Sequence, residues 1–371
     1  MVLSYELARQ TPEAHSVMTP PEHVSSSSQR HEPPSSSEQI SADARFAVIV
    51  ATRNRGRKIA QLVESIQRSD ARDFEFVIVD QSTNDESQLA LIPYLADPRI
   101  RYVRSSQTGL SCARNLGVAL TRAPIIAITD DDCIVPSNWL TGIGRPFEEH
   151  PRVGVVFCSV RPVPVQEPGI TPQIIFSANR LITNVSDVWT SSRTSLCLGA
   201  GMAIRRTMLA DVGNFDELLG AGAKFGSSED NDLSWRGLLR GWFTFQCADV
   251  SVLHDGHRNL DEVRGLMARD FYGIGGAVAK HLRAGNWQIL RFLKTWLIYF
   301  GVTLPGRDVL AGRAPRGVGR PFILLRGVLD GLQIPIDRDG LVYWRDPVLV
   351  SKDETNTGRG HSLAGAVLNE R

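Results

Sequence analysis

The feature that most constrains this sequence is a series of short apolar runs that alternate with amphipathic segments. Three of these runs are FAVIVA at 46–51, FEFVIVD at 74–80 and PIIAIT at 124–129. Runs of this length, rich in Val and Ile, are typical of strands that are buried on both faces, and their alternation with helices is typical of a parallel sheet. We therefore predict an α/β fold whose mixed, mostly parallel sheet is flanked by helices.

The same patterns place the other elements of this fold. Further strands are predicted at 99–104, 153–160 and 243–253, the last of them ending at His254. Helices are predicted at 58–68, 111–120 and 230–239.

Composition narrows the class of protein. Hydrophobic residues make up 42% of the chain and charged residues 22%, which is typical of a globular protein. The five cysteines form no CxxC pair, so we expect reduced core thiols of a cytosolic protein rather than a disulfide framework or a zinc site. No N-terminal apolar segment predicts a secretory signal, and no uncharged apolar run is long enough to span a membrane. We predict no nucleic-acid partner.

Polar residues follow three of the predicted strands directly. They are Thr52, Arg53, Asn54 and Arg55 after the first strand, Asp80 and Ser82 at the second, and Asp130, Asp131 and Asp132 after 124–129. Ligands bind at the carboxyl ends of strands in open parallel sheets. Three adjacent carboxylates repel one another unless a cation or hydrogen bonds compensate them, and such oxygen clusters suit Mg²⁺ or Mn²⁺. A solvated acidic turn is the alternative.

Two further segments carry candidate chemistry. Arg114 lies in the first turns of a helix that follows Gly109, where it could reach a phosphate or a base edge; a surface arginine is the alternative. Asp230 begins a helix after a glycine-rich loop, where an acid is either a helix cap or a general base at the mouth of a cleft.

Taken in order, these segments resemble a known enzyme family. Residues 46–254 are similar to the inverting family 2 glycosyltransferases, which have the Rossmann-like GT-A fold. The resemblance rests on VIVATRNR at 48–55, VDQST at 79–83, TGLSCARNLG at 108–117, TDDDC at 129–133 and SSEDNDLSWRGLLRGW at 227–242. The sequence departs from the family at Arg53 and Arg55, where many relatives have an aromatic residue and an acid. The resemblance therefore does not identify the nucleotide of the donor.

The resemblance implies a role for each candidate residue. Asp230 is the implied catalytic base, with Glu229 beside it. The implied metal ligands for Mn²⁺ or Mg²⁺ are Asp130, Asp132 and His254, the last of which could instead be a structural histidine. The implied nucleotide-binding residues are Thr52, Arg53, Asn54, Arg55, Asp80, Ser82, Arg114, Asp130 and Asp131.

The implied reaction moves a sugar from a nucleotide diphosphate sugar to an acceptor hydroxyl. One base and one displacement would invert the anomeric carbon, and the acceptor is a glycan, a lipid-linked molecule or a small molecule. A silent nucleotide-sugar-binding module is the alternative; a nucleotidyltransferase is disfavoured because no GxxxxGK[ST] loop is present.

The expected domain organisation follows from the resemblance and from composition. A Ser/Pro-rich disordered tail at 1–44 precedes a catalytic domain at 45–280, whose nucleotide-binding half at 45–135 is followed by an acceptor half at 136–280. A basic amphipathic helical extension is expected at 281–350, and a flexible tail at 351–371.

The sequence leaves two interpretations open for the extension at 281–350. Between Lys280 and Arg326 there are nine Lys/Arg and one acid, and 287–300 is apolar except for a narrow polar stripe. Either the segment 281–326 contacts a membrane surface, which would place the protein at the inner face of the cell membrane, or it packs on the catalytic domain or on the partner in a homodimer.

Overall fold

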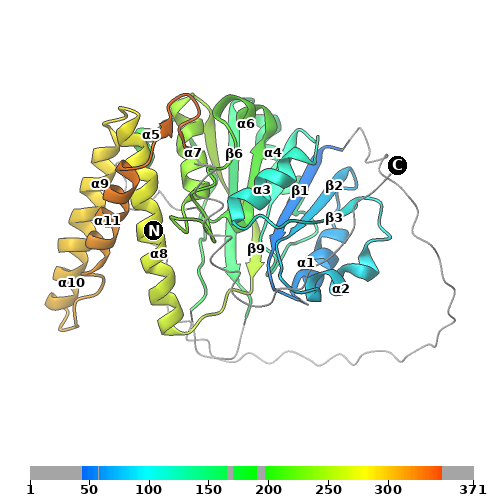
Figure 1. Cartoon of the computed structure of the whole chain (residues 1–371), viewed down its shortest axis with the longest axis horizontal. Helices are drawn as coiled ribbons and strands as arrows, with labels where there is room; N and C mark the ends of the chain where they lie inside the picture. The colour runs from blue at the N-terminus through cyan, green and yellow to red at the C-terminus, as the bar shows by residue number, and fades with distance from the viewer. Residues whose placement is uncertain (1–43, 57, 165–169, 190–196, 345–371) are drawn as a thin grey trace, which may run out of the picture.

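The computed structural model describes residues 44–56, 58–164, 170–189 and 197–344. Within them, a nine-stranded sheet has the order β3-β2-β1-β4-β8-β6-β9-β5, and β7 also pairs with β9 (Figure 1). The strands are β1 Phe46–Thr52, β2 Phe74–Asp80, β3 Ile100–Arg104, β4 Ile125–Ile128, β5 Cys133–Ile134, β6 Val153–Pro162, β7 Arg180–Ile182, β8 Met202–Arg205 and β9 Phe243–His254. A separate hairpin pairs β10 Ile336–Asp337 with β11 Val342–Tyr343.

The predicted fold class is confirmed. Strands β3, β2, β1 and β4 are parallel neighbours, and β6 is parallel to β9. Strand β8 is antiparallel to both β4 and β6, so those two strands point the same way. The helices are α1 Lys58–Gln67, α2 Glu86–Leu91, α3 Leu110–Ala119, α4 Trp139–Glu149, α5 Val185–Trp189, α6 Arg206–Val212, α7 Glu229–Leu239, α8 Leu260–Arg283, α9 Ile289–Ile298, α10 Leu304–Leu310 and α11 Arg320–Leu332.

The six predicted strands and three predicted helices all exist, with ends that shift by one or two residues. The sequence patterns missed the short β5, β7 and β8 and the helices α2, α4, α5, α6 and α8. The predicted tails at 1–44 and 351–371 lie outside the described residues, except for Ala44, which is buried. All five cysteines are free thiols, and four of them are buried, whereas Cys197 is partly exposed. In the described part of the chain, no helix is long and apolar enough to cross a membrane.

Strand β1 lies at the centre of the core because both of its faces are covered. Phe46, Val48 and Val50 pack with residues of α1 and α4. The alternate residues, Ala47 and Ile49, pack with residues of α3 and α6 on the opposite face. The period of two along a strand therefore explains why the run is apolar throughout.

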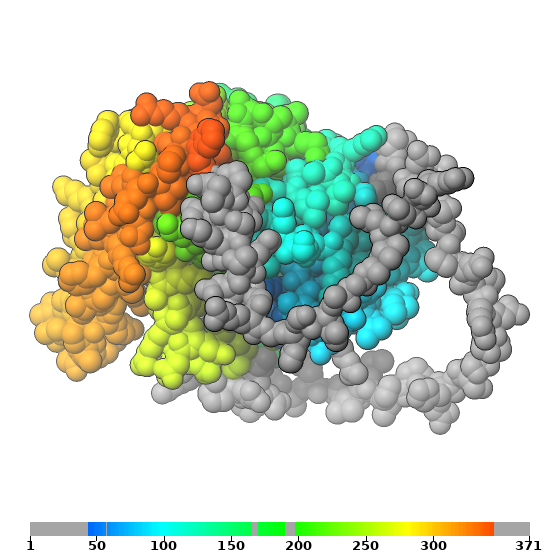
Figure 2. Space-filling view, in the orientation of Figure 1, coloured from blue at the N-terminus to red at the C-terminus, as the bar shows by residue number. Residues whose placement is uncertain are grey.

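A helical group formed by α8, α9, α10 and α11 closes one end of the molecule (Figures 1 and 2). Helix α8 begins with a capping box, in which the Asn259 side chain accepts from the backbone of Glu262 and the Glu262 side chain accepts from the backbone of Asn259. Helices α8 and α11 cross at backbone contact distance: a Cβ on Gly275 would lie 2.2 Å from the Leu324 carbonyl oxygen. The predicted boundary at 280/281 falls inside α8.

Buried ion pairs join α8 to α7. The Lys280 ammonium lies 2.7 Å from Asp216 and 2.7 Å from Asp232, and Arg236 pairs with Asp232 at 2.9 Å; all four side chains are fully buried. The Tyr343 N–H, on β11, also donates to Asp216. This network anchors the C-terminal helices to α7 and the loop before it.

Replacing Lys280 by Met should lower the free energy of unfolding by about 3–5 kcal/mol, because two buried carboxylates would lose a shared counter-charge. Urea unfolding followed by circular dichroism measures the change. The matched control is Lys294→Met on the exposed side of α9, which should change stability by less than about 0.5 kcal/mol. Equal stability of the two variants would show that the network makes no net contribution to the free energy of unfolding.

Candidate active site

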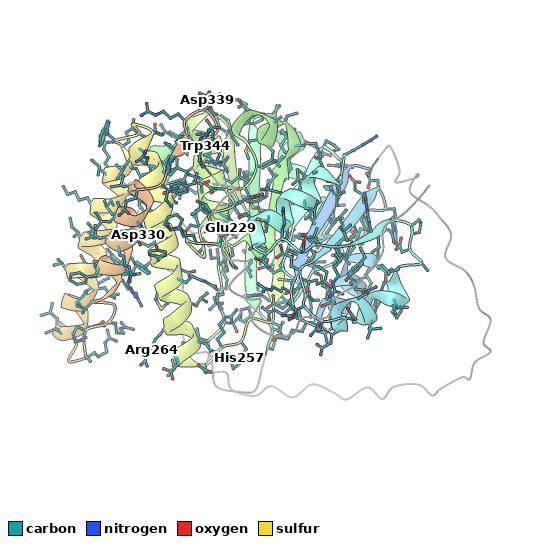
Figure 3. All side chains as sticks on the ribbon, in the orientation of Figure 1. Glu229, His257, Arg264, Asp330, Asp339 and Trp344 are labelled. Carbon is teal, nitrogen blue, oxygen red and sulfur yellow. The ribbon has the colours of Figure 1, made fainter. Side chains whose placement is uncertain are left out.

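A cavity with a volume of about 390 Å³ opens at the carboxyl ends of β1 and β4. Helices α7 and α8 form its other wall, and Glu229, labelled in Figure 3, lies between the sheet and α8. The cavity brings together most of the residues that the sequence nominated: Thr52, Arg53, Arg55, Arg114, Asp130, Asp131, Asp132, Glu229, Asp230 and His254.

Three nominated residues do not line this cavity. Asp80 is fully buried, and its carboxylate accepts from the Ser82 N–H and the Tyr102 hydroxyl, both at 2.7 Å. The Asn54 side-chain oxygen accepts from the Thr83 N–H, and the backbone N–H of Asn54 donates to the Ser82 hydroxyl. These contacts brace the turns after β1 and β2, and direct contact with a nucleotide stays a prediction for Asn54, Asp80 and Ser82.

The three adjacent aspartates have different partners. The Thr52 hydroxyl donates to Asp131 at 2.7 Å, and the Arg55 guanidinium lies 3.7 Å from Asp131 and 3.4 Å from Asp132. Burial is the largest influence on Asp131 and raises its pKa to about 7. Arg55 therefore supplies local counter-charge at a position where the motif departs from its relatives.

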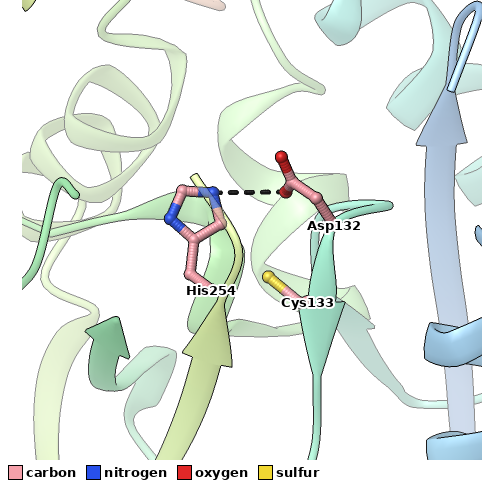
Figure 4. A group of neighbouring side chains, drawn as sticks. All are labelled: Asp132, Cys133 and His254. Carbon is pink, nitrogen blue, oxygen red and sulfur yellow. Dashed lines mark ion pairs between the residues drawn. The ribbon is translucent and has the colours of Figure 1, made fainter. Parts of the chain in front are cut away.

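Strand pairing brings His254 next to the aspartates. Cys133 on β5 lies directly opposite His254 in the antiparallel pairing of β5 with β9. As a result, His254 Nε2 lies 3.2 Å from Asp132 Oδ1 (Figure 4). Burial lowers the pKa of His254, but the hydrogen bond and charge of Asp132 outweigh it, so the pKa is raised.

Asp132, Cys133 and His254 offer ligand atoms within 4.8 Å of one another. Burial raises the pKa of the Cys133 thiol well above its usual range, so the thiol stays protonated and is a poor ligand. A carboxylate and an imidazole remain as candidate ligands for a divalent cation. Asp130, the other predicted metal ligand, lies outside this group and lies 3.3 Å from Arg114.

Arg114 connects the two walls of the cavity. Its side chain is only 2% exposed, and its guanidinium lies 2.8 Å from Glu229 on α7 and 3.3 Å from Asp130 after β4. A Cβ on Gly199 would lie 2.7 Å from this guanidinium, so glycine is needed there. The surface-arginine alternative is therefore wrong, and contact of Arg114 with a ligand stays a prediction.

Asp230 is buried at the start of α7. Its Oδ1 accepts from the backbone and side-chain amides of Asn231, at 2.7 Å and 3.1 Å. Burial and then the charge of Glu229 raise the pKa of Asp230 to about 7, although Arg114 opposes them. Ser228, just before the helix, has a φ of 75°, a strained conformation of the kind found at functional sites.

The sequence analysis missed the wall that α8 contributes. Arg258 precedes this helix, and Leu266, Arg269 and Asp270 line the cavity from one of its faces. The Asn259…Glu262 spacing was the available signal, because a capping box marks the start of a helix.

Comparison with known proteins agrees with this geometry. The family model described as "Glycosyl transferase family 2" matches residues 47–213, from β1 through Asp130–Asp132 to the end of α6. The chain contains a family 2 glycosyltransferase domain. Asp230 and His254 lie beyond the matched residues of this domain.

Individual relatives of the glycosyltransferase domain are distant. An uncharacterized glycosyltransferase of Rickettsia bellii is 34% identical over 103 residues, which are 28% of this chain and 15% of that protein. The uncharacterized glycosyltransferase EpsJ of Bacillus subtilis is 28% identical over 139 residues, 37% of this chain and 40% of that protein. The chain thus matches less than half the length of either relative.

A solved structure resembles the fold over a longer range. The mannosyltransferase PcManGT of Pyrobaculum calidifontis, in complex with GDP-Man and Mn²⁺, has a TM-score of 0.54 and 19% sequence identity. The similarity covers 78% of this chain and 87% of that one. At this identity the comparison supports the GT-A fold and says nothing of the substrate.

Replacing Asp230 by Asn should stabilise the folded protein at pH 8. Because the pKa of Asp230 is raised to about 7 in the folded state, wild type loses stability as the pH rises from the ordinary Asp pKa of about 4 to about 7, and Asn removes that loss. We expect Tm to rise by a few degrees, and the difference from wild type to shrink toward pH 5, where wild-type Asp230 is protonated. Differential scanning fluorimetry from pH 5 to 8 measures this, and a destabilised variant at pH 8 would contradict it.

Proposed function

We propose that the protein transfers a sugar from a nucleotide diphosphate sugar to an acceptor hydroxyl, with inversion at the anomeric carbon. The observation that carries the proposal is the presence of Asp230 in one cavity with the Asp132–His254 pair. A cation site and a carboxylate of raised pKa are the two parts that metal-assisted transfer to a hydroxyl requires.

Asp230 accepts the proton of the attacking hydroxyl in this mechanism. A pKa near 7 suits a general base at neutral pH. Its neighbour Glu229 is held by Arg114 at 2.8 Å, so it is not free to act as a covalent nucleophile. One base and one displacement give inversion.

Asp132 and His254 would hold the divalent ion, and the imidazole favours Mn²⁺ over Mg²⁺. When bound, the ion neutralises the charge that develops on the departing nucleotide diphosphate. Thr52, Arg53 and Arg55 line the side of the cavity where we place the nucleotide. A silent binding module would have no use for a buried base, so we do not favour it.

A panel of nucleotide diphosphate sugars tests the proposal. We expect slow hydrolysis of one donor in the presence of Mn²⁺, and loss of at least about 100-fold in rate for Asp132→Ala and for Asp230→Asn, as for other acid–base and electrostatic groups. The matched control is Asp261→Asn on the exposed start of α8, which should retain wild-type rates.

Three results would contradict parts of the proposal. Metal-dependent binding without turnover of any donor, even with acceptor extracts, would favour the silent module. Full activity of Asp230→Asn would remove Asp230 as the base. Retention of the anomeric configuration in the transfer product, read by proton NMR, would exclude the single displacement.

We also propose that the protein docks on an anionic membrane surface, at the inner face of the cell membrane. The apolar side of α9, with Phe292 and Trp296, is buried against the protein, as is Phe300 just after it, so this helix packs inward. The surface that we propose for the membrane is instead the segment at 302–322, which contains α10 and the start of α11. Its exposed apolar side chains are Val302, Val309, Leu310, Val318 and Phe322.

The charge of this segment fits an anionic surface. Arg307, Arg313 and Arg316 are exposed there, and Asp308, the one acid of the segment, is buried beneath Arg313 and Arg316. Insertion of apolar side chains with basic residues around them is the way peripheral proteins bind such bilayers.

Replacing Leu310 and Phe322 together by Glu should reduce binding to vesicles containing phosphatidylglycerol by about tenfold or more, because two exposed apolar side chains would become charged. Vesicle co-sedimentation measures this. The matched control makes the same replacement by Glu at Leu89 and Ile92, which are exposed at 63% and 58% in the distant α2 region. This control variant should bind vesicles as wild type does. Wild-type protein that does not sediment with these vesicles would refute the docking.

A further inference from the structure

The wall of the cavity next to α8 carries positive charge that the proposed chemistry leaves without a role. Arg258 and Arg269 both line the cavity. Neither side chain forms an ion pair with another residue in the described part of the chain, whereas Arg55 and Arg114 in the same cavity each face two carboxylates.

Arg258 has an unusual environment for an arginine. Its Nε is buried and has no hydrogen-bond partner among the described residues. Buried polar groups are almost always hydrogen-bonded, because an unmade bond costs about 1–3 kcal/mol. A donor left unpaired at the edge of a cavity therefore points to a ligand that accepts from it.

Arg269 is held beside the start of the catalytic helix. It lies on one face of α8 with Leu266 and Asp270, at spacings of three and four residues. Its aliphatic stem lies over Gly226, where a Cβ would come within 2.5 Å of the Arg269 Cγ. Gly226 is four residues before Asp230, so the guanidinium belongs to the wall on the side of the proposed base.

The local charge balance leaves a net positive charge on this wall. The charges of Arg269 and Arg258 both reach Asp270, and burial, the largest influence, nevertheless raises the pKa of that carboxyl to about 6. The Ser227 side chain hydrogen-bonds Asp270. Among the described residues, one carboxylate thus faces two guanidinium groups, which leaves a net positive charge on this wall.

We propose that Arg258 and Arg269 form an acceptor subsite that binds a phosphate group carried by the acceptor. This inference rests on the proposed transfer to a hydroxyl. Guanidinium groups bind phosphate through paired, charge-assisted hydrogen bonds, and an anion held on the Asp230 side of the cavity belongs to the molecule whose hydroxyl Asp230 deprotonates. The donor diphosphate is the other source of the same chemistry.

Calorimetric titration with glycerol 3-phosphate, and with glycerol as its neutral match, tests the subsite. EDTA is present so that a metal ion cannot bind the phosphate. We expect wild type to prefer glycerol 3-phosphate, and Arg258→Gln and Arg269→Gln each to weaken its binding by about tenfold or more, the size of a charged hydrogen bond. The matched control is Arg264→Gln, an exposed arginine on the same helix that pairs with Asp261.

A second arm distinguishes the two sources of phosphate. Binding of GDP and UDP is measured with Mn²⁺ for the same variants, and an acceptor subsite predicts a smaller loss for the nucleotides than for glycerol 3-phosphate. A loss at least as large for the nucleotides would assign the arginines to the donor and overturn the proposal. Equal binding of glycerol 3-phosphate by wild type and both variants would overturn it too.

The two proposals fail in different ways. If wild type hydrolyses no donor but the arginine variants lose glycerol 3-phosphate binding, the transfer reaction is wrong and the phosphate subsite stands. Thermal melting of each variant checks that it is folded, and either arginine variant alone is sufficient for the test if the other does not fold.

Discussion

Three carboxylates in one turn of α7, Glu229, Asp230 and Asp232, are buried, and the surrounding structure is arranged to compensate them. Arg114 on α3 compensates Glu229 from the cavity side, while Lys280 and Arg236 compensate Asp232. Asp230 lies between them and is hydrogen-bonded only by the neutral amides of Asn231 among the bonds described. Because the nearby cations pair with Glu229 and Asp232, burial is the largest influence on Asp230 and raises its pKa. The raised pKa of the proposed base thus follows from how the other two acids are paired.

The sequence was sufficient for the part of the site that depends on strand ends. Strands β1 and β4 are adjacent and parallel, so their ends lie at the same edge, and the Thr52 hydroxyl at the end of one donates to Asp131 after the other. The position of His254 could not be deduced in this way. It depends on the antiparallel pairing of β5 with β9, and β5 has only two residues, too short for a periodic signal. The family resemblance, rather than periodicity, nominated this histidine.

Helix α8 shows a second limit of sequence patterns. Its buried face contains Lys280 and His281 together with glycines and alanines, so it does not read as an apolar stripe. Lys280 can be buried only because Asp216 and Asp232 meet it, and those residues are 64 and 48 positions away in the chain. Gly275 suits the close crossing with α11, which no local pattern reveals. Burial of this helix is therefore a property of its partners, and only its capping box was visible in advance.

The same helix gives the C-terminal region a mechanical role. At 1.5 Å per residue, the 24 residues of α8 span about 36 Å. Arg269, near the middle of the helix, lines the cavity, and Lys280, near its C-terminal end, lies beneath α7. Between them, Gly275 packs on α11 without room for a side chain. The cavity wall and the segment at 302–322 are thus parts of one packed unit. If the segment at 302–322 docks on a membrane, this packing would fix the distance between the membrane surface and Asp230, because a close-packed helix pair deforms little.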